Sequence, residues 1–182
     1  MLVGVLALQG GFAAHGRMLR ALGADVREVR VGADLDGLDG LVIPGGESTT
    51  MSLGIERERL AELLRAFAGP ILGTCAGLIV LDRAHLGLMD IEARRNAFGR
   101  QVRSFEADLE VAGIDGPPLR AVFIRAPWIA SHGDGVEILA SVDGHAVAAR
   151  QGRLLAVAFH PELGTDARLH ELFLASCDGT TD

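Results

Sequence analysis

Long apolar runs and thiols are both scarce in this sequence. The longest apolar runs, such as residues 4–8 and 154–159, have the length of strands and fall short of the roughly 20 residues that a membrane-spanning helix needs. The two cysteines, Cys75 and Cys177, lie far apart, which favours reduced thiols over a disulfide, and no zinc-type spacing is present. The sequence therefore predicts no membrane span, no disulfide and no metal site.

A concentration of positive charge is missing as well. The 17 basic residues are scattered along a chain of net charge −7, so nucleic acid is not an expected partner. The sequence begins directly with strand-like residues 2–8, without a basic leader or a cleavage site, which predicts a cytoplasmic protein. At 182 residues, with 49% hydrophobic and 23% charged residues, we expect one globular domain over residues 1–182.

Hydrophobic patterns in the first half alternate between strand and helix. Strands are predicted at residues 2–8, 26–31, 40–43 and 71–74, and a helix that starts near His15 closes at Gly23. A second helix ends at Gly69-Pro70, and a third begins with the buried residues 78–81. The second helix is predicted to place five residues on one buried face: Leu53, Leu60, Leu63, Leu64 and Phe67.

From about residue 100 the pattern changes to strands joined by turns. Strands are predicted at residues 103–111, 121–124, 136–141, 146–149 and 154–159. A final helix over residues 166–175 should place Leu169, Leu172 and Phe173 on its inner face. Parallel βα units followed by an antiparallel half predict an α/β fold: a single-domain three-layer sandwich with a central mixed, mostly parallel sheet.

A nucleophile is predicted at the end of the strand over residues 71–74. Gly73-Thr74-Cys75-Ala76-Gly77 has the glycine spacing of a nucleophile elbow, a sharp strand-to-helix turn that exposes its central residue. Small neighbours permit the strained turn, and the start of a helix favours a thiolate. The alternative is that Cys75 is a small core residue, as many free cysteines are.

A base with its orienting carboxylate is predicted at the end of another strand. His160 and Glu162 stand two positions apart after the apolar residues 154–159 and can project to the same side. Such pairs are often structural or solvated when they occur in isolation. Because ligands of open α/β sheets bind beyond the carboxyl ends of the strands, we expect Cys75 and His160 to meet there.

The loop Pro44-Gly45-Gly46-Glu47-Ser48-Thr49-Thr50 also follows a strand and precedes a helix. Its backbone N–H groups suit either a developing oxyanion or a bound phosphate. No Gly-Lys-Ser/Thr sequence and no nearby lysine supports a phosphate, and Glu47 would repel one. An oxyanion-stabilising loop is therefore favoured.

These three segments together resemble the class I, triad-type glutamine amidotransferases. Further strings narrow the resemblance to the glutaminase subunits of pyridoxal 5'-phosphate synthase, from Val3 to about Phe173. The strings are Leu6-Ala7-Leu8-Gln9-Gly10, Arg95-Asn96-Ala97-Phe98-Gly99-Arg100-Gln101, Ser104-Phe105-Glu106-Ala107-Asp108 and Phe123-Ile124-Arg125-Ala126-Pro127.

The resemblance implies that the chain hydrolyses L-glutamine and passes the ammonia through a tunnel to a barrel-shaped synthase subunit that makes vitamin B6. Catalytic roles are implied for Cys75, His160 and Glu162, and an oxyanion hole for the backbone of Gly46 and Ala76. No cofactor is expected for the glutaminase step. Six residues are implied to hold glutamine and one to lie near the synthase: Gly46, Glu47, Ser48, Arg95, Ile124 and Arg125, and Gln9.

Two other functions stay open at this stage. A glutaminase for another acceptor, such as imidazole glycerol phosphate, shares the triad and is disfavoured by the string over residues 95–101. A non-catalytic domain of the same fold is disfavoured by the intact triad. The stretch over residues 81–86 is shorter than is usual in the resembled family, which could alter the surface that faces the partner.

Overall fold

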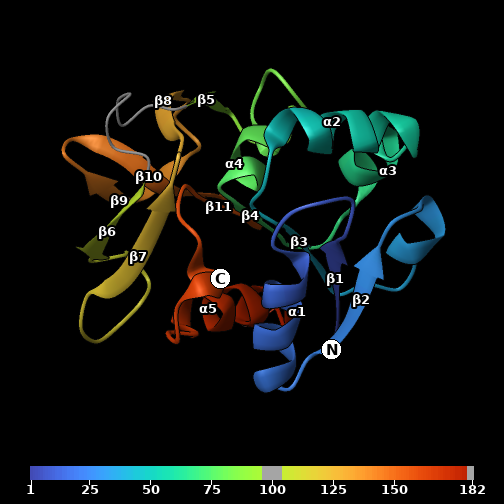
Figure 1. Ribbon diagram of the computed structural model, residues 1–182, viewed down its shortest axis with the longest axis horizontal. Helices are drawn as coiled ribbons and strands as arrows, with labels where there is room; N and C mark the ends of the chain where they lie inside the picture. Colours follow the sequence, from blue (N-terminus) through green and yellow to red (C-terminus); the bar gives the residue numbers. More distant parts are fainter. Residues whose placement is uncertain (96–103, 180–182) are drawn as a thin grey trace.

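The computed structural model describes residues 1–95 and 104–179, and these form three layers (Figure 1). A central sheet is covered by α1 and α5 on one face and by α2, α3 and α4 on the other. The elements of the first half are β1 (Leu2–Leu6), α1 (Phe12–Ala21), β2 (Asp25–Val29), η1 (Gly32–Leu35), β3 (Gly40–Ile43), α2 (Ser48–Arg57), α3 (Ala61–Ala66), β4 (Ile71–Thr74) and α4 (Ala76–Leu81).

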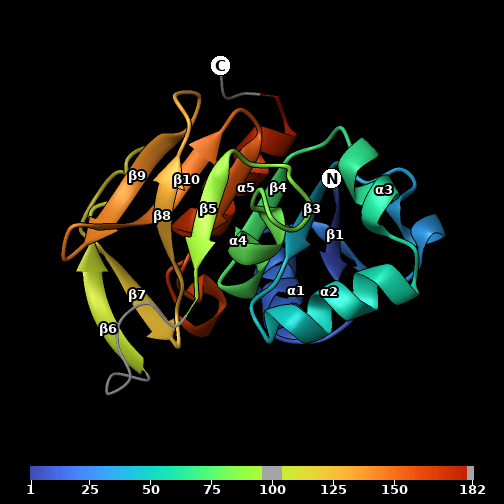
Figure 2. The same ribbon diagram turned by 90° about the horizontal axis from the view of Figure 1, so that it is seen from above.

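The second half contains most of the antiparallel strands. They gather at the end of the molecule away from α2 and α3, as Figure 2 shows. The elements are β5 (Ile91–Arg94), β6 (Ser104–Leu109), β7 (Leu119–Ile124), β8 (Trp128–His132), β9 (Glu137–Val142), β10 (His145–Gln151), β11 (Leu154–Val157), η2 (Pro161–Leu163) and α5 (Arg168–Cys177).

Nine strands of the described residues form the central sheet, in the order β2-β1-β3-β4-β11-β10-β8-β5, with β9 paired to β10. The strands from β2 to β11 in this order run parallel, and the remaining pairs are antiparallel. The predicted α/β fold with a mixed sheet between helical layers is confirmed. That residues 1–182 form one domain stays a prediction.

The parallel strands lie in the middle of the fold because their side chains are apolar on both faces. Every residue of β3 and β4 is buried, as expected for strands covered by helices on both sides. The register pairs Thr74 of β4 with Val157 of β11. The residues that follow these two strands therefore emerge side by side at one edge of the sheet, which is where Cys75 and His160 were predicted to meet.

The predicted long helix before Gly69 is wrong, because the chain forms two helices there. Arg59 adopts a left-handed conformation (φ 56°) that separates α2 from α3. Leu53 and Leu63 are 60% and 46% exposed, so the five predicted residues do not share a buried face. Each short helix buries its own positions, chiefly Met51 and Ile55 on α2 and Leu64 on α3.

The strands differ from the sequence prediction in three respects. β1 ends at Leu6, two residues before the predicted end, and the predicted strands did not include β5 or β8. β6 and β7 pair only with each other in a separate two-stranded sheet within the described residues, where they alternate exposed and buried positions. In the final helix Leu169 and Phe173 are buried as predicted, whereas Leu172 is half-buried.

The described residues contain no helix that is both long and apolar enough to cross a membrane. Within the same ranges, no group of three or more His, Cys, Asp or Glu side chains is arranged to hold a metal ion.

Candidate active site

Cys75 lies at a strained junction between β4 and α4. Its backbone has φ 49° and ψ −102°, a conformation that L-residues with a side chain rarely adopt. The turn needs two glycines because a Cβ at Gly73 would lie 2.8 Å from the backbone of Gly77, and one at Gly77 would overlap the carbonyl of Ile43. The predicted elbow is present, and Cys75 is 6% exposed with its Sγ 3.9 Å from the Ile124 carbonyl oxygen.

His160 follows β11 and is fixed at both its backbone and its ring. The backbone N–H of His160 donates to the Val122 carbonyl. Nδ1 of its ring lies 2.8 Å from Oε1 of Glu162, which belongs to the first turn of η2. Burial opposes the charged ring, but contacts with Cys75 and Glu162 raise the pKa of His160 to about 10. The ring is therefore an imidazolium at neutral pH beside the cysteine.

Glu162 is buried and stays ionised. Burial alone would raise its pKa, but the imidazoles of His15 and His160 hold the pKa of this carboxyl well below its usual value. The three predicted catalytic side chains thus lie in order, with the carboxylate against the imidazole and the imidazole against the thiol. This arrangement matches a nucleophile, a base and an orienting group.

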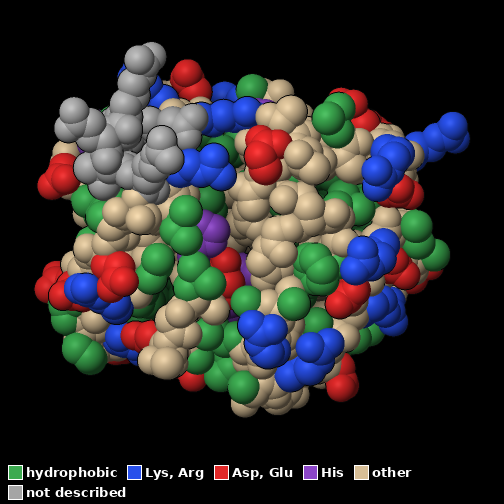
Figure 3. Space-filling view, in the orientation of Figure 1, with side chains coloured by type: hydrophobic (Ala, Val, Ile, Leu, Met, Phe, Trp, Pro, Cys, Tyr) green, Lys and Arg blue, Asp and Glu red, His purple; other side chains and the backbone are tan. Residues whose placement is uncertain are grey.

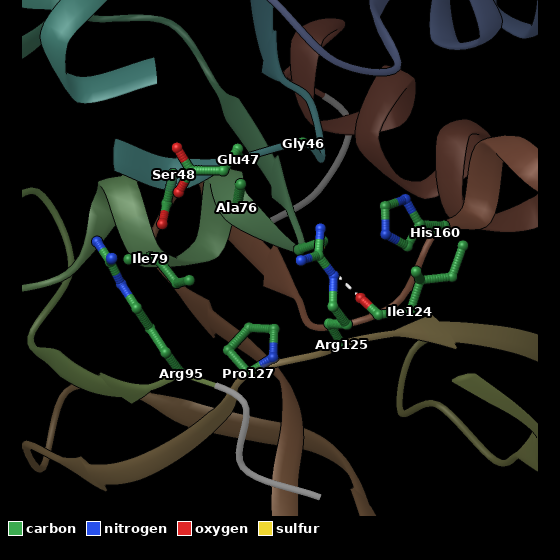
Figure 4. Close-up of a pocket in the computed structure, with 11 residues that line it drawn as sticks. Gly46, Glu47, Ser48, Ala76, Ile79, Arg95, Ile124, Arg125, Pro127 and His160 are labelled. Carbon is green, nitrogen blue, oxygen red and sulfur yellow. Dashed lines mark hydrogen bonds between the residues drawn. The ribbon is translucent and has the colours of Figure 1, made fainter. Parts of the chain in front are cut away.

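A cavity of about 250 Å³ opens over Cys75. Figure 4 shows Arg95 and Arg125 extending toward its Glu47 and Ser48 side, while His160 faces it from the other side. In Figure 3 histidine and acidic side chains are visible at the floor of a hollow in the middle of this face. The lining residues are Gly46, Glu47, Ser48, Cys75, Ala76, Ile79, Arg95, Ile124, Arg125, Pro127 and His160.

The carboxylate of Glu47 caps α2. It accepts hydrogen bonds from the backbone N–H groups of Thr49 and Thr50 at 3.0 and 2.8 Å and from the Thr50 hydroxyl at 2.8 Å. The Thr50 hydroxyl and these N–H groups lower the pKa of Glu47 to about 2. The place that a phosphate would take at this helix start already holds a carboxylate, which agrees with the sequence argument against a phosphate cradle.

The two predicted arginines differ in how firmly they are held. Arg95 donates to the Thr49 hydroxyl at 3.1 Å and approaches Nε2 of His85 at 3.4 Å. Arg125 is exposed, adopts a left-handed backbone (φ 45°), and has no hydrogen bond or ion pair to any described residue. Its guanidinium is therefore available to an anionic ligand in the cavity. The other residues of the string that begins at Arg95 lie outside the described residues.

Gln9 lies three residues beyond β1 rather than at its end. Its side chain donates to the Glu47 carbonyl at 3.0 Å and accepts from the Glu47 N–H at 3.2 Å. Gln9 also packs against Gly46, where a Cβ would overlap it. The residue predicted to lie near a partner is thus tied to the backbone of the predicted oxyanion loop.

Three polar residues of this site were not predicted from the sequence. His15 on α1, Thr74 on β4 and His170 on α5 are completely buried, and His15 contacts the other two as well as Glu162. One signal was available, because His15 and Leu19 lie four residues apart and therefore on the same buried face of α1. Nothing in the sequence pairs His15 with His170, which lies 155 positions away.

Comparison with known proteins gives consistent matches over nearly the whole chain. The pyridoxal 5'-phosphate synthase subunit PdxT of Parafrankia sp. (strain EAN1pec) is 54% identical, covering 94% of this chain and 91% of its own. The protein of the same name from Herpetosiphon aurantiacus is 55% identical, covering 96% and 99%. A crystal structure described as a glutamine amidotransferase superposes with a TM-score of 0.88 at 43% identity, covering 97% and 98%.

The match to a family model agrees with these relatives. The model of the SNO glutamine amidotransferase family matches residues 5–179, which includes every residue of the predicted site. The family resemblance that the sequence motifs indicated is therefore confirmed. The chain is a glutamine amidotransferase and belongs to the SNO glutamine amidotransferase family.

Proposed function

We propose that this chain hydrolyses L-glutamine to L-glutamate and ammonia, and that the ammonia serves the synthase subunit of a cytoplasmic pyridoxal 5'-phosphate synthase. The observation that carries the proposal is that Cys75 and the imidazole of His160 line one cavity and contact each other, while Glu162 holds the imidazole at Nδ1. The printed names of the relatives support the acceptor.

Cys75 is the nucleophile of the first step. The positive charge of His160 favours a thiolate, whose sulfur attacks the side-chain carbonyl carbon of glutamine. The resulting oxyanion collapses, the C–N bond breaks, and the imidazolium gives its proton to the departing ammonia. A γ-glutamyl thioester on Cys75 and a neutral His160 remain.

His160 acts as the base of the second step. The neutral ring takes a proton from water while the water oxygen attacks the thioester carbonyl. The C–S bond then breaks and the thiolate and imidazolium form again, while the new carboxyl group loses the second proton of the water to solvent and glutamate leaves. Glu162 holds Nδ1 of the ring as a donor throughout, so that the other nitrogen faces the reacting atoms.

Backbone and arginine groups of the cavity bind the substrate. The N–H groups of Gly46 and Ala76 stabilise the oxyanion, since both residues line the cavity beside Cys75. Arg125, which has no partner among the described residues, pairs with the α-carboxylate, and Arg95 assists it. Three further residues complete the glutamine site: Glu47, Ser48 and Ile124.

Gln9 connects the site to the synthase in this proposal. Its two hydrogen bonds to Glu47 hold the peptide next to Gly46, so a partner that docks against Gln9 acts directly on the oxyanion loop. The synthase carries glutaminase subunits around its core in this proposal, and the glutaminase step needs no cofactor. A glutaminase for imidazole glycerol phosphate is the second candidate, and the names of the relatives speak against it.

The test is glutamate release from glutamine by this protein, alone and with a pyridoxal phosphate synthase subunit. The proposal predicts weak release by the protein alone and a sharp rise with the synthase. Strong release that the synthase does not change would keep the glutaminase and reject the acceptor. No release in either arm would favour the non-catalytic domain.

A further inference from the structure

The outer oxygen of Glu162 has an unusual environment. Oε1 is occupied by His160, whereas Oε2 is buried and has no hydrogen-bond partner among the described residues. Nε2 of His15 lies 3.3 Å from Oε2. A buried ionised oxygen without a donor is costly, so the contact with His15 is the one that compensates it.

Geometry assigns the proton positions in this cluster. Nε2 of His15 also lies 3.1 Å from the Thr74 hydroxyl, and Nδ1 lies 2.8 Å from Nε2 of His170. A lone pair on Nε2 of His15 at 3.3 Å from the ionised Oε2 would be repelled by it, so this nitrogen carries a proton. In the arrangement with the fewest protons, Nδ1 of His15 accepts from Nε2–H of His170, and Nδ1 of His170 is left as an acceptor.

The remaining atom of the cluster agrees with this assignment. Nδ1 of His170 is the second buried polar atom that has no partner among the described residues. In a doubly protonated His170 this atom would be a buried unpaired donor on a charged ring, which costs more than an unpaired neutral acceptor. Burial lowers the pKa of His170 to about 3, so the ring is neutral at physiological pH.

We propose that His15, oriented by His170, is a positioning residue of the glutaminase site that holds the Glu162 carboxylate on the side opposite His160. The inference rests on the proposed function and deepens it, because it extends the chain of contacts from Cys75 to α5. Within the described residues, the titratable groups around Glu162 are His15 from α1, His160 at the start of η2 and, behind His15, His170 from α5. Thr74 of β4 is uncharged.

His15 acts on the reaction through two other residues. With its N–H in place, Glu162 keeps both its charge and its orientation, and the His160 imidazolium is stabilised beside the thiol. Without that N–H, the carboxylate is free to rotate or to take up a proton, and the imidazolium loses its support. The thiolate of Cys75 then forms only at higher pH.

The test compares His15→Leu, which removes the donor, with His15→Gln, whose amide N–H can take the place of Nε2–H. Leu19→Ala is the matched control, because Leu19 is equally buried on α1 and its loss destabilises the fold without touching Glu162. Glutamate release is measured with the synthase present, together with the melting temperature of each variant.

We expect His15→Leu to lower kcat/KM by roughly 10- to 100-fold, because the buried charge of Glu162 loses its contact with the His15 ring. His15→Gln should recover a large part of the loss, and Leu19→Ala should keep near-normal kcat/KM despite its lower melting temperature. Equal losses in His15→Leu and Leu19→Ala, or no recovery in His15→Gln, would overturn the proposal.

A second measurement does not depend on glutamine. The rate of Cys75 alkylation by iodoacetamide, followed by peptide mass against pH, reports the thiolate directly. We expect the midpoint to move upward by about one pH unit in His15→Leu and to stay in place in Leu19→Ala. An unchanged or lowered midpoint would contradict the role of His15, whereas a shifted midpoint without any glutamate release would reject the proposed function alone.

The unmodified protein offers a test if His15→Leu does not fold. Nitrogen-15 NMR of the histidine rings distinguishes the two tautomers. The proposal requires a proton on Nε2 of His15. An Nδ1–H tautomer at His15 would place a lone pair against the carboxylate and would overturn the proposal.

Discussion

Two buried carboxylates of this protein each hold a histidine, and the two pairs have nearly the same geometry. Oε1 of Glu162 lies 2.8 Å from Nδ1 of His160, and Oδ1 of Asp82 lies 2.7 Å from Nδ1 of His85. The two carboxylate side chains are 2% and 3% exposed. The contact between carboxylate and imidazole therefore does not by itself distinguish a catalytic pair from a structural one.

The surroundings of the two pairs are what differ. Asp82 also accepts from the backbone N–H groups of Ala84, His85 and Ala93, and so fastens the chain that follows α4. Glu162 receives no such backbone donors from the residues that the structure describes, and imidazoles approach it on both sides. We infer that Asp82 stabilises a loop that includes part of the stretch over residues 81–86, whereas Glu162 orients the imidazole of His160.

The largest expected effect separates the two cysteines. Cys75→Ala should lower glutamate release by roughly 10⁴-fold or more, because no other thiol reaches the cavity. Cys177→Ala should retain activity, since burial and then Asp39 and Asp178 raise the pKa of Cys177 to about 12 and keep this thiol unreactive. Both variants are assayed with the synthase, and comparable losses would refute the assignment of the nucleophile.

The second effect tests the two carboxylates against each other. Glu162→Gln should lower kcat by roughly 100-fold or more while leaving some activity, because an amide cannot stabilise the imidazolium. Asp82→Asn should keep kcat per folded molecule and lose about 1–3 kcal/mol of unfolding free energy, since hydrogen bonds in a buried loop are lost. Urea titrations and steady-state assays on both proteins give the two numbers.

If Asp82→Asn instead lowered kcat as strongly as Glu162→Gln, the distinction between the two pairs would be wrong. Asp82 and His85 would then act on the reaction through the substrate-binding Arg95, since Nη2 of Arg95 lies 3.4 Å from Nε2 of His85.

A third, smaller effect probes the position of Glu162 without changing its chemistry. A Cβ at Gly11 would lie 2.8 Å from Oε1 of Glu162, although the Gly11 backbone (φ −76°) suits alanine. Gly11→Ala should therefore lower kcat/KM by about tenfold with little change in stability. Gly164→Ala is the control, because its nearest atoms are at 3.8 Å and its φ is −90°. Full activity in Gly11→Ala would show that the carboxylate tolerates displacement.

The smallest effect on catalysis is expected from His170. The protonation of His170 is best followed through the unfolding free energy measured at several pH values. Its folded-state pKa of about 3 lies below the ordinary 6.5, so the unfolded chain binds a proton that the folded one does not as pH falls from 6.5. Unfolding free energy should drop by about 1–2 kcal/mol between pH 6.5 and 5. The decrease precedes that from Glu162, whose lowered pKa affects stability only below about 4.5.

The variant His170→Gln should remove most of that decrease, as measured by urea unfolding at the two pH values. His132→Gln, at an exposed position, serves as the control and should leave the decrease intact. The same decrease in wild type and His170→Gln would mean that another group takes up the proton.

The sequence predicted the parts of this molecule that are local in the chain. The elbow at Cys75 depends on glycines two residues away, and His160 and Glu162 belong to one short segment, so spacing alone places them. The parallel core was predictable because β3 and β4 are apolar throughout. The break at Arg59 was missed because the leucines on both sides of it also fit one continuous helical period.

The hydrophobic pattern of the sequence could not predict polar contacts between segments that are distant in the chain. His15 looked like one more position on the apolar face of α1, and its meeting with His170 requires α1 and α5 to lie together under the sheet, as Figure 1 shows. Asp82 and Ala93 are likewise joined only by the fold. Tertiary packing decides such polar pairs, because each partner alone has an ordinary sequence environment.

The most direct test of the central claim is covalent labelling of the protein, with the synthase present, by a glutamine analogue that carries an electrophile at the side-chain carbonyl. Peptide mass spectrometry then locates the label. The account predicts one label on Cys75, formed more slowly when free glutamine is added and absent from Cys177. Labelling of Cys177 instead, or labelling of Cys75 that glutamine does not slow, would contradict the claim that Cys75 is the nucleophile of a glutamine site.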